Sequence, residues 1–403
     1  MSQPVALILA FVLIIVLINR KVPLPLAMLA GSATLGLGLG LGPLRTLQVM
    51  GRGMLSPASL ELVVVVALIT ILGRLMQEFG LLQQTIDALT GALRSTRLAL
   101  VAAPTMVGLL PVIGGAIISA PIVDGLGDRL ELPPAVKAAV NLVFRHAWFF
   151  VFPFNTTLIL AAQLADMPLG QLIRMQWPLS LVAVVVGYLV YFRGRPREQF
   201  AAGGPTRGAL TLAFLVMGSP LLIGLVLSVA FGLHMAPALA IGIALAFYLG
   251  RRHPSAHPRL LWLGIDRWMV LTMPSIVAFR EVVGEAGVMA VMVSTLVQGG
   301  MPLLALAFFL PLVVGFIGAS NSTTIGITFP LLLPLAEPAV RPVLVMLMFT
   351  SSFVAYLVSP LHLCQILTLD YFRLRLGSIY GGYLLPMGAT LLAVWGLAWL
   401  YLR

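Results

Sequence analysis

Charged residues are scarce in this 403-residue sequence, at 9%, whereas 60% of its residues are hydrophobic. A soluble globule of this size needs far more polar surface, so the composition excludes a soluble fold. The apolar runs lack the alternation of membrane-spanning strands, which argues against a β-barrel. They are too many and too long for a single anchor. We therefore predict an all-α polytopic membrane protein.

Cysteine is almost absent, since Cys364 is the only one, and this excludes a disulfide framework. A lone thiol in an apolar helix is expected to be a small core residue. The five histidines are scattered without metal-ligand spacing, and the sequence has no nucleotide-binding motif. The sequence therefore predicts that the protein is not an enzyme and that it needs no cofactor other than Na⁺ as a coupling ion.

Acidic residues are few, 13 against 24 basic ones, which gives a net charge of +11. The basic residues fall mainly in loops between apolar runs, so they report membrane topology rather than binding to nucleic acid. Threading the chain with the Arg20-Lys21 turn in the cytoplasm places 16 of them inside and 5 outside. This bias predicts a multi-pass protein of the prokaryotic inner membrane, with residues 194–207 as a cytoplasmic linker rich in Gly, Pro and Arg.

A shift of 207 residues superimposes the helix breakers of one half of the chain on those of the other. Pro104 meets Pro311 and Pro153 meets Pro360, and glycines match at the same offset. Together with the charge bias, this predicts two inverted-topology repeats, each with a re-entrant hairpin and a broken transmembrane helix. The predicted units are residues 1–193 (scaffold helices 1–45, transport part 60–193) and 208–403 (scaffold helices 208–250, transport part 266–403), with hairpins at 98–128 and 303–336.

Four interruptions, the two hairpin tips and the two breaks, are expected to meet near the membrane midplane. Half-helix N-termini present free amides to an anion, while carbonyl, amide and hydroxyl oxygens suit Na⁺. The alternative roles are helix capping for the polar residues and tight packing for the glycines. The predicted binding residues on these segments are Gly114, Gly115, Asn155, Thr156, Thr157, Asn321, Ser322, Thr323, Thr324, Ser359 and His362, with Na⁺ expected near Asn155, Asn321, Ser322 and Thr323.

Arg145 lies inside an apolar run about two turns before Pro153. An intramembrane cation is costly, so it should face the protein interior and have a partner. Its planar guanidinium suits a substrate carboxylate, and we include it in the predicted site. A structural bridge to Asp124, or snorkelling to the interface, is the alternative. For His362, the alternatives are a proton carrier and a neutral hydrogen-bonding wall.

The layout resembles the ion transporter superfamily, which includes divalent anion/sodium symporters and gluconate and citrate permeases. The more specific resemblance is to an uncharacterised bacterial and archaeal membrane branch with a Pro-x-x-Gly-Gly-Ala tip and an Asn-x-x-Phe-Arg-His helix, here Pro111 to Ala116 and Asn141 to His146. It implies a homodimer with a fixed scaffold and a mobile transport domain. In sodium-coupled relatives both hairpin tips carry Ser-Asn-Thr, whereas here only Asn321-Ser322-Thr323 is similar.

These observations predict a secondary active transporter of the elevator type that moves a small anionic, carboxylate-bearing solute with Na⁺ or H⁺. A sodium/proton antiporter is the alternative, although no carboxylate lies at the predicted midplane. An intramembrane enzyme or a channel is less favoured, because the chain offers no convincing base near its Ser and Thr residues and its breaks are duplicated. The expected partners are the solute, membrane lipid and a second copy of the chain.

Overall fold

The computed structural model describes residues 3–110, 115–195, 205–251, 253, 258–285 and 302–403. These residues form helices joined by short turns, without a β-strand in the described ranges. Five helical segments are long and apolar enough to cross a membrane: Pro57–Glu78, Leu169–Phe192, Arg207–Val229, Arg341–Tyr371 and Gly377–Tyr401. The prediction of an all-α polytopic membrane protein is therefore confirmed.

The first half of the chain contains ten α-helices and one 3₁₀ turn within its described part. They are α1 (Gln3–Asn19), α2 (Leu24–Gly38), α3 (Pro43–Met54), α4 (Pro57–Glu78), α5 (Leu81–Leu93), α6 (Thr96–Gly108), α7 (Gly115–Asp128), α8 (Pro134–His146), η1 (Ala147–Phe150), α9 (Thr156–Leu164) and α10 (Leu169–Phe192).

The described α-helices of the second half follow the same order, but its 3₁₀ turn precedes α18 instead of following it. Its described elements are α11 (Arg207–Val229), α12 (Met235–Gly250), α13 (Arg259–Leu263), α14 (Arg267–Glu285), α16 (Leu303–Gly318), α17 (Asn321–Leu332), η2 (Leu333–Leu335), α18 (Arg341–Val358), α19 (Leu363–Tyr371) and α20 (Gly377–Tyr401). The 207-residue shift carries both ends of α9 onto α19, and the starts of α6 and α8 onto those of α16 and α18. Pro153 and Pro360 thus lie in breaks at equivalent places, whereas the matched Pro104 and Pro311 lie inside α6 and α16 and do not end them.

Contacts between helices are related by the same shift. Helix α4 packs on α12 and α14 packs on α2, while α9 packs on α17 and α19 packs on α7. Helices α10 and α20, which are equivalent, pack on each other. The contacts are therefore exchanged between the halves, as a two-fold relation between the repeats requires.

Two helical hairpins occupy the predicted positions. In the first, α6 and α7 have 13 and 14 residues, and in the second, α16 and α17 have 16 and 12. Each pair packs together, and each arm is shorter than the roughly 20 residues needed to cross the hydrocarbon. The tip of the first hairpin, with the predicted site residue Gly114, lies outside the described residues, as does most of the predicted linker.

A glycine in each hairpin allows its first arm to reach the helix behind it. A Cβ at Gly108 would overlap the backbone carbonyl of Arg145 on α8, and a Cβ at Gly315 would lie 3.0 Å from the carbonyl oxygen of Ser352 on α18. Arg145 and Ser352 are themselves 207 residues apart. The matched glycines therefore serve the same close approach in both repeats.

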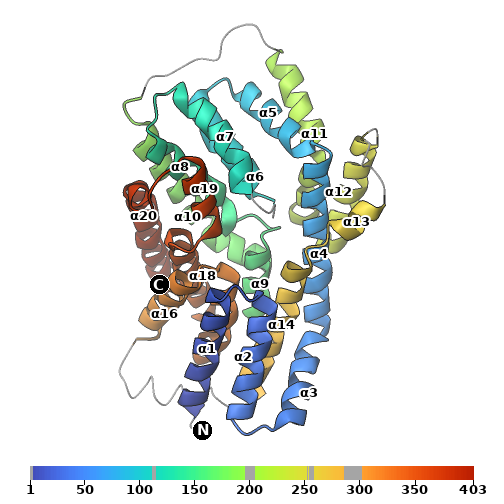
Figure 1. Ribbon diagram of the computed structural model, residues 1–403, viewed down its shortest axis with the longest axis vertical. Helices are drawn as coiled ribbons and strands as arrows, with labels where there is room; N and C mark the ends of the chain where they lie inside the picture. Colours follow the sequence, from blue (N-terminus) through green and yellow to red (C-terminus); the bar gives the residue numbers. More distant parts are fainter. Residues whose placement is uncertain (1–2, 111–114, 196–204, 252, 254–257, 286–301) are drawn as a thin grey trace.

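The helices form two groups that meet at the centre of the molecule (Figure 1). Helices α1 to α4 pack with α12 to α14, whereas α6 to α10 pack among themselves and with α16 to α20. Contacts of α9 with α4 and of α17 with α14 join the two groups. The predicted division into scaffold and transport parts stays a prediction, but α4 and α14 pack along the predicted scaffold helices.

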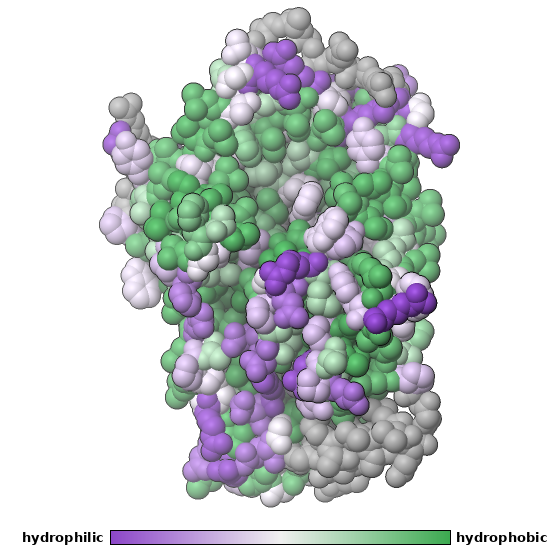
Figure 2. Space-filling model, turned by 180° about the vertical axis from the view of Figure 1, so that it is seen from behind, coloured by the Kyte–Doolittle hydropathy of each residue, from purple (hydrophilic) through white to green (hydrophobic). Residues whose placement is uncertain are grey.

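Large apolar side chains cover much of the outer surface. Leu212 on α11 and Leu384, Leu392 and Leu400 on α20 are all more than half exposed. Figure 2 shows broad apolar areas on one face, with hydrophilic side chains gathered at its upper end and across its lower half. Exposed apolar area of this extent is expected of helices in contact with lipid.

Candidate functional site

A cavity of about 330 Å³ lies where the second hairpin tip, the first helix break and the start of α14 meet. Each repeat contributes to its wall, so residues far apart in the sequence surround one space. Its lining residues are Gly108, Leu109, Leu110, Arg145, His146, Phe149, Phe152, Phe154, Asn155, Thr156, Thr157, Asp266, Met269, Ala319, Ser320, Asn321, Ser322, Tyr356 and Cys364.

Arg145 is the buried cation of this cavity. It lies in the last turn of α8 and is only 6% exposed. Its Nε and Nη1 atoms are buried and have no hydrogen-bond partner among the described residues, and no carboxylate of the described chain forms an ion pair with it. An uncompensated guanidinium in such a place is costly, which makes the cavity attractive to an anion.

The structural bridge to Asp124 does not form. Asp124 instead accepts a hydrogen bond of 2.7 Å from Lys137 Nζ, and Asp128 accepts one of 2.5 Å from the same ammonium group. The lysine lies on α8 two turns before Arg145, and both aspartates lie on α7. The acids of this region are therefore committed to Lys137 and leave Arg145 available.

Gly115 provides the space in which the Arg145 guanidinium lies. A Cβ at this position would overlap both terminal nitrogens of the guanidinium. Its repeat equivalent is Ser322, and the equivalent of Arg145 is the small Ser352. The first tip therefore combines a glycine with a long cation, and the second combines polar side chains with a serine. Gly115 positions the arginine rather than lining the cavity itself.

The second hairpin tip is tied to its surroundings by hydroxyl groups. Ser352 Oγ donates to Asn321 Oδ1 at 2.5 Å, and the Asn321 Nδ2 atom is buried without a partner among the described residues. Ser322 Oγ lies 2.9 Å from Thr157 Oγ1, which links this tip to the broken helix of the other repeat. Asn321 and Ser322 both line the cavity.

Helix capping occurs at the N-termini of α9 and α17, which open on the cavity. Asn155 Oδ1 accepts from the amides of Thr157 and Leu158 at 2.9 and 3.1 Å, and so caps α9. Ser320 Oγ caps α17 through the Thr323 amide at 3.2 Å and also accepts from Thr323 Oγ1 at 2.6 Å. Capping and cavity lining are thus compatible, because these side chains stand at the helix ends that face the space.

The second break, between α18 and α19, lies next to the cavity, and neither Ser359 nor His362 lines it. Ser359 Oγ donates to the Phe316 carbonyl of α16 at 2.7 Å, and His362 lies fully buried against the ring of Tyr356, with centroids 4.2 Å apart. Thr324 donates to the Ser320 carbonyl at 2.9 Å. Ser359, His362, Thr323 and Thr324 therefore belong to the supporting layer.

Of the predicted site residues, the structure brings six to the cavity wall: Arg145, Asn155, Thr156, Thr157, Asn321 and Ser322. The sequence did not indicate the contributions of His146, Tyr356, Asp266 and Cys364. Asp266 is the one carboxylate among the described lining residues, and its Oδ1 caps α14 by accepting from Trp268 and Met269 at 3.0 Å each. In the sequence, the only sign of this capping role is that Asp266 directly precedes an apolar helical stretch.

Comparison with known families gives a match over almost the whole chain. Residues 3–401 match the family model described as "Protein of unknown function (DUF401)". The chain belongs to this DUF401 family. The predicted resemblance to an uncharacterised membrane branch is thereby confirmed at the level of the family, whereas membership of the ion transporter superfamily stays a prediction. No curated protein matches the chain.

The DUF401 chain is similar in structure to the Alcanivorax borkumensis YdaH transporter, whose crystal structure is described as revealing an unusual topology. The TM-score is 0.60, the sequence identity is 16%, and the match covers 87% of this chain and 85% of that one. At this identity the similarity establishes a shared fold.

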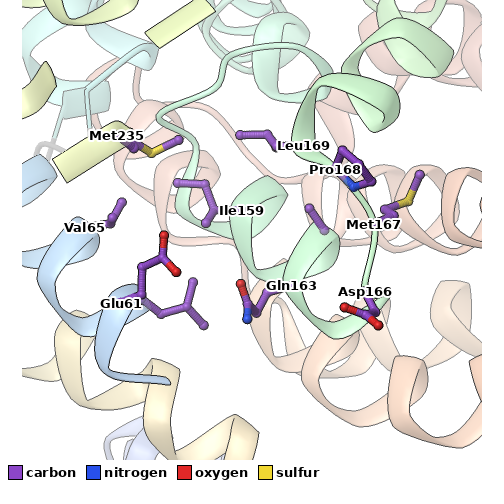
Figure 3. Close-up of a pocket in the computed structure, with 11 residues that line it drawn as sticks. Glu61, Val65, Ile159, Gln163, Asp166, Met167, Pro168, Leu169 and Met235 are labelled. Atoms are coloured by element: carbon purple, nitrogen blue, oxygen red, sulfur yellow. The ribbon is translucent and has the colours of Figure 1, made fainter. Parts of the chain in front are cut away.

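A second cavity of about 450 Å³ in the DUF401 chain lies between α4, α9 and α12. Figure 3 shows Glu61 of α4 facing Ile159 and Gln163 of α9, with Asp166 at the turn after α9. Both acids are exposed. This acidic space contrasts with the cavity that holds Arg145, so an anion is expected to favour the latter.

Proposed function

We propose that this DUF401 protein is a secondary active transporter that moves a small, carboxylate-bearing anion by an elevator mechanism, coupled to Na⁺ or H⁺. The observation that carries the proposal is the buried Arg145 guanidinium, which has no acidic partner among the described residues and lines a cavity between the two repeats. A bound carboxylate supplies the missing charge and accepts paired hydrogen bonds from the guanidinium.

Two helix N-termini add to this attraction. The first residues of α9 and α17 line the same cavity as Arg145. Each helix start carries partial positive charge and amide donors, which favour a negatively charged group. The hydroxyl and amide oxygens at the same positions provide the proposed Na⁺ ligands, near Asn155, Asn321, Ser322 and Thr323.

The place of the cavity in the fold supports alternating access. Its walls come from α14 on one side and from the hairpin tip and broken helix on the other. We propose that the hairpins and broken helices move against α4 and α14, which remain with the scaffold helices on which they pack. The fold shared with a protein described as a transporter agrees with this proposal.

Uptake into proteoliposomes tests the proposal. The purified protein is assayed against a panel of small mono- and dicarboxylates, with sodium and pH gradients imposed separately. Saturable, gradient-driven uptake of a carboxylate is expected. Conduction that persists without a gradient and does not saturate would show a channel instead.

Arg145→Gln tests the site itself. We expect solute affinity to fall at least tenfold, because the carboxylate loses its ion pair with a buried guanidinium, while Arg145→Lys retains part of the affinity. Arg174→Gln, which removes an exposed guanidinium of α10, serves as the matched control. Equal uptake by Arg145→Gln and the control would disprove the role of Arg145.

Coupling is tested by Asn321→Ala and Asn155→Ala. If these residues bind Na⁺, both variants should raise the sodium concentration needed for half-maximal uptake, with a smaller effect on the proton-driven component. Unchanged sodium dependence in both would exclude this Na⁺ site.

Native mass spectrometry in detergent separately tests the proposed homodimer.

The sodium/proton antiporter remains the alternative, and Asp266 is the observation that favours it. Its carboxylate lines the cavity, although Oδ1 already accepts two amides of α14. An antiporter would show sodium-driven proton movement without any solute, and Asp266→Asn would abolish it.

A further inference from the structure

Two histidines and the single cysteine of the chain meet at the wall of the central cavity. His146 ends α8, His362 precedes α19, and Cys364 is the second residue of α19. Their potential ligand atoms all lie within 4.8 Å of one another. His146 and Cys364 line the cavity, whereas His362 is fully buried beside them. Helix capping or packing does not require this combination of side chains.

Backbone carbonyls fix the two imidazoles. His146 Nδ1 lies 2.7 Å from the Leu142 carbonyl oxygen, and His362 Nδ1 lies 3.1 Å from that of Tyr356. A carbonyl oxygen only accepts hydrogen bonds, so each Nδ1 carries the hydrogen and each Nε2 keeps its lone pair in the neutral ring. The Nε2 of His362 is buried without a partner among the described residues. This arrangement, with one nitrogen held by a carbonyl and the other left open, is typical of histidines that bind metals.

We propose that His146 Nε2, His362 Nε2 and Cys364 Sγ form a three-coordinate site for a soft monovalent d¹⁰ metal ion, Cu⁺. One ring nitrogen of each histidine and Cys364 Sγ all lie within 4.8 Å of one another. Three such atoms can be reached from one point at no more than about 2.8 Å, and metal–nitrogen and metal–sulfur bonds are about 2.0–2.3 Å. The ligand atoms therefore need to move by no more than about 0.5–0.8 Å. The central cavity provides the path by which the ion enters.

Charge distinguishes Cu⁺ from a divalent ion. Arg145 directly precedes His146 and has no acidic partner among the described residues. A divalent ion bound by one thiolate and two neutral imidazoles leaves one positive charge, which the buried guanidinium of Arg145 repels. Cu⁺ with the same ligands is neutral, and thiolate is the ligand type that soft ions prefer.

The binding step needs no oxidant or reductant when the ion is supplied as Cu⁺. The S–H bond of Cys364 breaks, its proton leaves through the cavity to solvent, and the sulfur electron pair forms the bond to the metal. The imidazoles donate their Nε2 lone pairs without losing a proton.

Competition for Cu⁺ and protection of the thiol test the site. Purified protein in detergent is titrated anaerobically with Cu⁺ against a chromophoric Cu⁺ chelator, and alkylation of Cys364 by a maleimide is followed in parallel. We expect one Cu⁺ per chain and at least a tenfold slower alkylation, whereas Zn²⁺ at the same concentration protects little. Because Cys364 is the only cysteine, the alkylation reports on this site alone.

Variants separate metal binding from folding. Cys364→Ser should bind no Cu⁺, and His146→Ala and His362→Ala should each weaken binding at least tenfold, while His234→Ala, which alters an exposed histidine before α12, should not. Size-exclusion profiles identify variants that fail to fold. Cu⁺ binding that survives Cys364→Ser, or no protection by Cu⁺, would overturn the site, and equal protection by Zn²⁺ would overturn the monovalent assignment. None of these measurements uses transport, so their outcome is independent of the proposed function.

Discussion

At the scale of single residues, two glycines of the first hairpin make opposite kinds of contact with Arg145. A Cβ on Gly108 would meet the backbone carbonyl of the arginine, whereas a Cβ on Gly115 would meet the end of its side chain. The backbone of α8 is held by its helical hydrogen bonds, while a guanidinium can rotate away. The two positions should therefore respond differently to the same added methyl group.

Gly108→Ala should destabilise the protein by about 1–3 kcal/mol, because the clash forces α6 and α8 apart. The midpoint of thermal unfolding in detergent measures this loss. Gly396→Ala on α20, where a Cβ would meet nothing within 4 Å, is the control. Equal midpoints for both variants would show that the close approach of α6 and α8 is unimportant.

Gly115→Ala should leave the unfolding midpoint near that of the parent and lower solute affinity several-fold, because the methyl group displaces the Arg145 guanidinium. Uptake kinetics, read as KM against maximal rate, measure the effect. A lowered midpoint with unchanged KM would instead assign Gly115 to packing alone.

At the scale of helices, an ion-pair cluster fastens α7 to α8. Lys137 is 5% exposed and pairs with Asp124 and Asp128, whose side chains are 37% and 72% exposed. A buried cation without its acids is costly, whereas an exposed carboxylate contributes little. The cluster fixes the helix that ends in Arg145 and His146, and so it supports the cavity from a distance.

Asp124→Asn should therefore destabilise the hairpin more than Asp128→Asn, and replacement of both should cost about 3 kcal/mol, as expected for breaking a buried pair. Hydrogen exchange of the amides of α7 and α8 checks this order. A larger increase in exchange for Asp128→Asn than for Asp124→Asn would show that the shorter hydrogen bond, and not burial of the carboxylate, determines the stability of the cluster.

At the scale of the whole molecule, the cavity stands where two groups of helices meet. Helix α11 packs on α12 and so belongs to the group of α1 to α4. Contacts across the boundary include the ring of Phe154, which lies 3.3 Å from a Cβ placed on Gly224 of α11. The ring of Phe144 lies equally close, at 3.3 Å, to a Cβ placed on Gly187 of α10, but both of these residues belong to one group. The two contacts offer matched positions for crosslinking.

A bifunctional thiol reagent applied to Phe154→Cys with Gly224→Cys, in a Cys364→Ala background that transports, should abolish uptake by joining the two groups. The same reagent on Phe144→Cys with Gly187→Cys should leave uptake largely intact. Crosslinked protein that still transports in the first pair would exclude a rigid-body movement at this boundary.

The sequence alone determined the elements of this fold, because helix ends follow from local backbone chemistry. Proline and glycine act on their own turn of helix, so Pro153 and Pro360 marked the breaks, and the 207-residue offset placed the two hairpins. The high apolar content likewise required a membrane protein, because a chain with so few charged residues cannot cover its surface with polar side chains in water.

Only the tertiary structure decided which side chains share a space. Arg145 meets Gly115 because α8 and α7 pack together, and His146 meets His362 and Cys364 across more than 200 residues of chain. No local pattern predicts such a meeting, because it depends on how helices cross. The scattered histidines and the single cysteine, which the sequence presents as unrelated residues, become one cluster only when the second break is folded against the first.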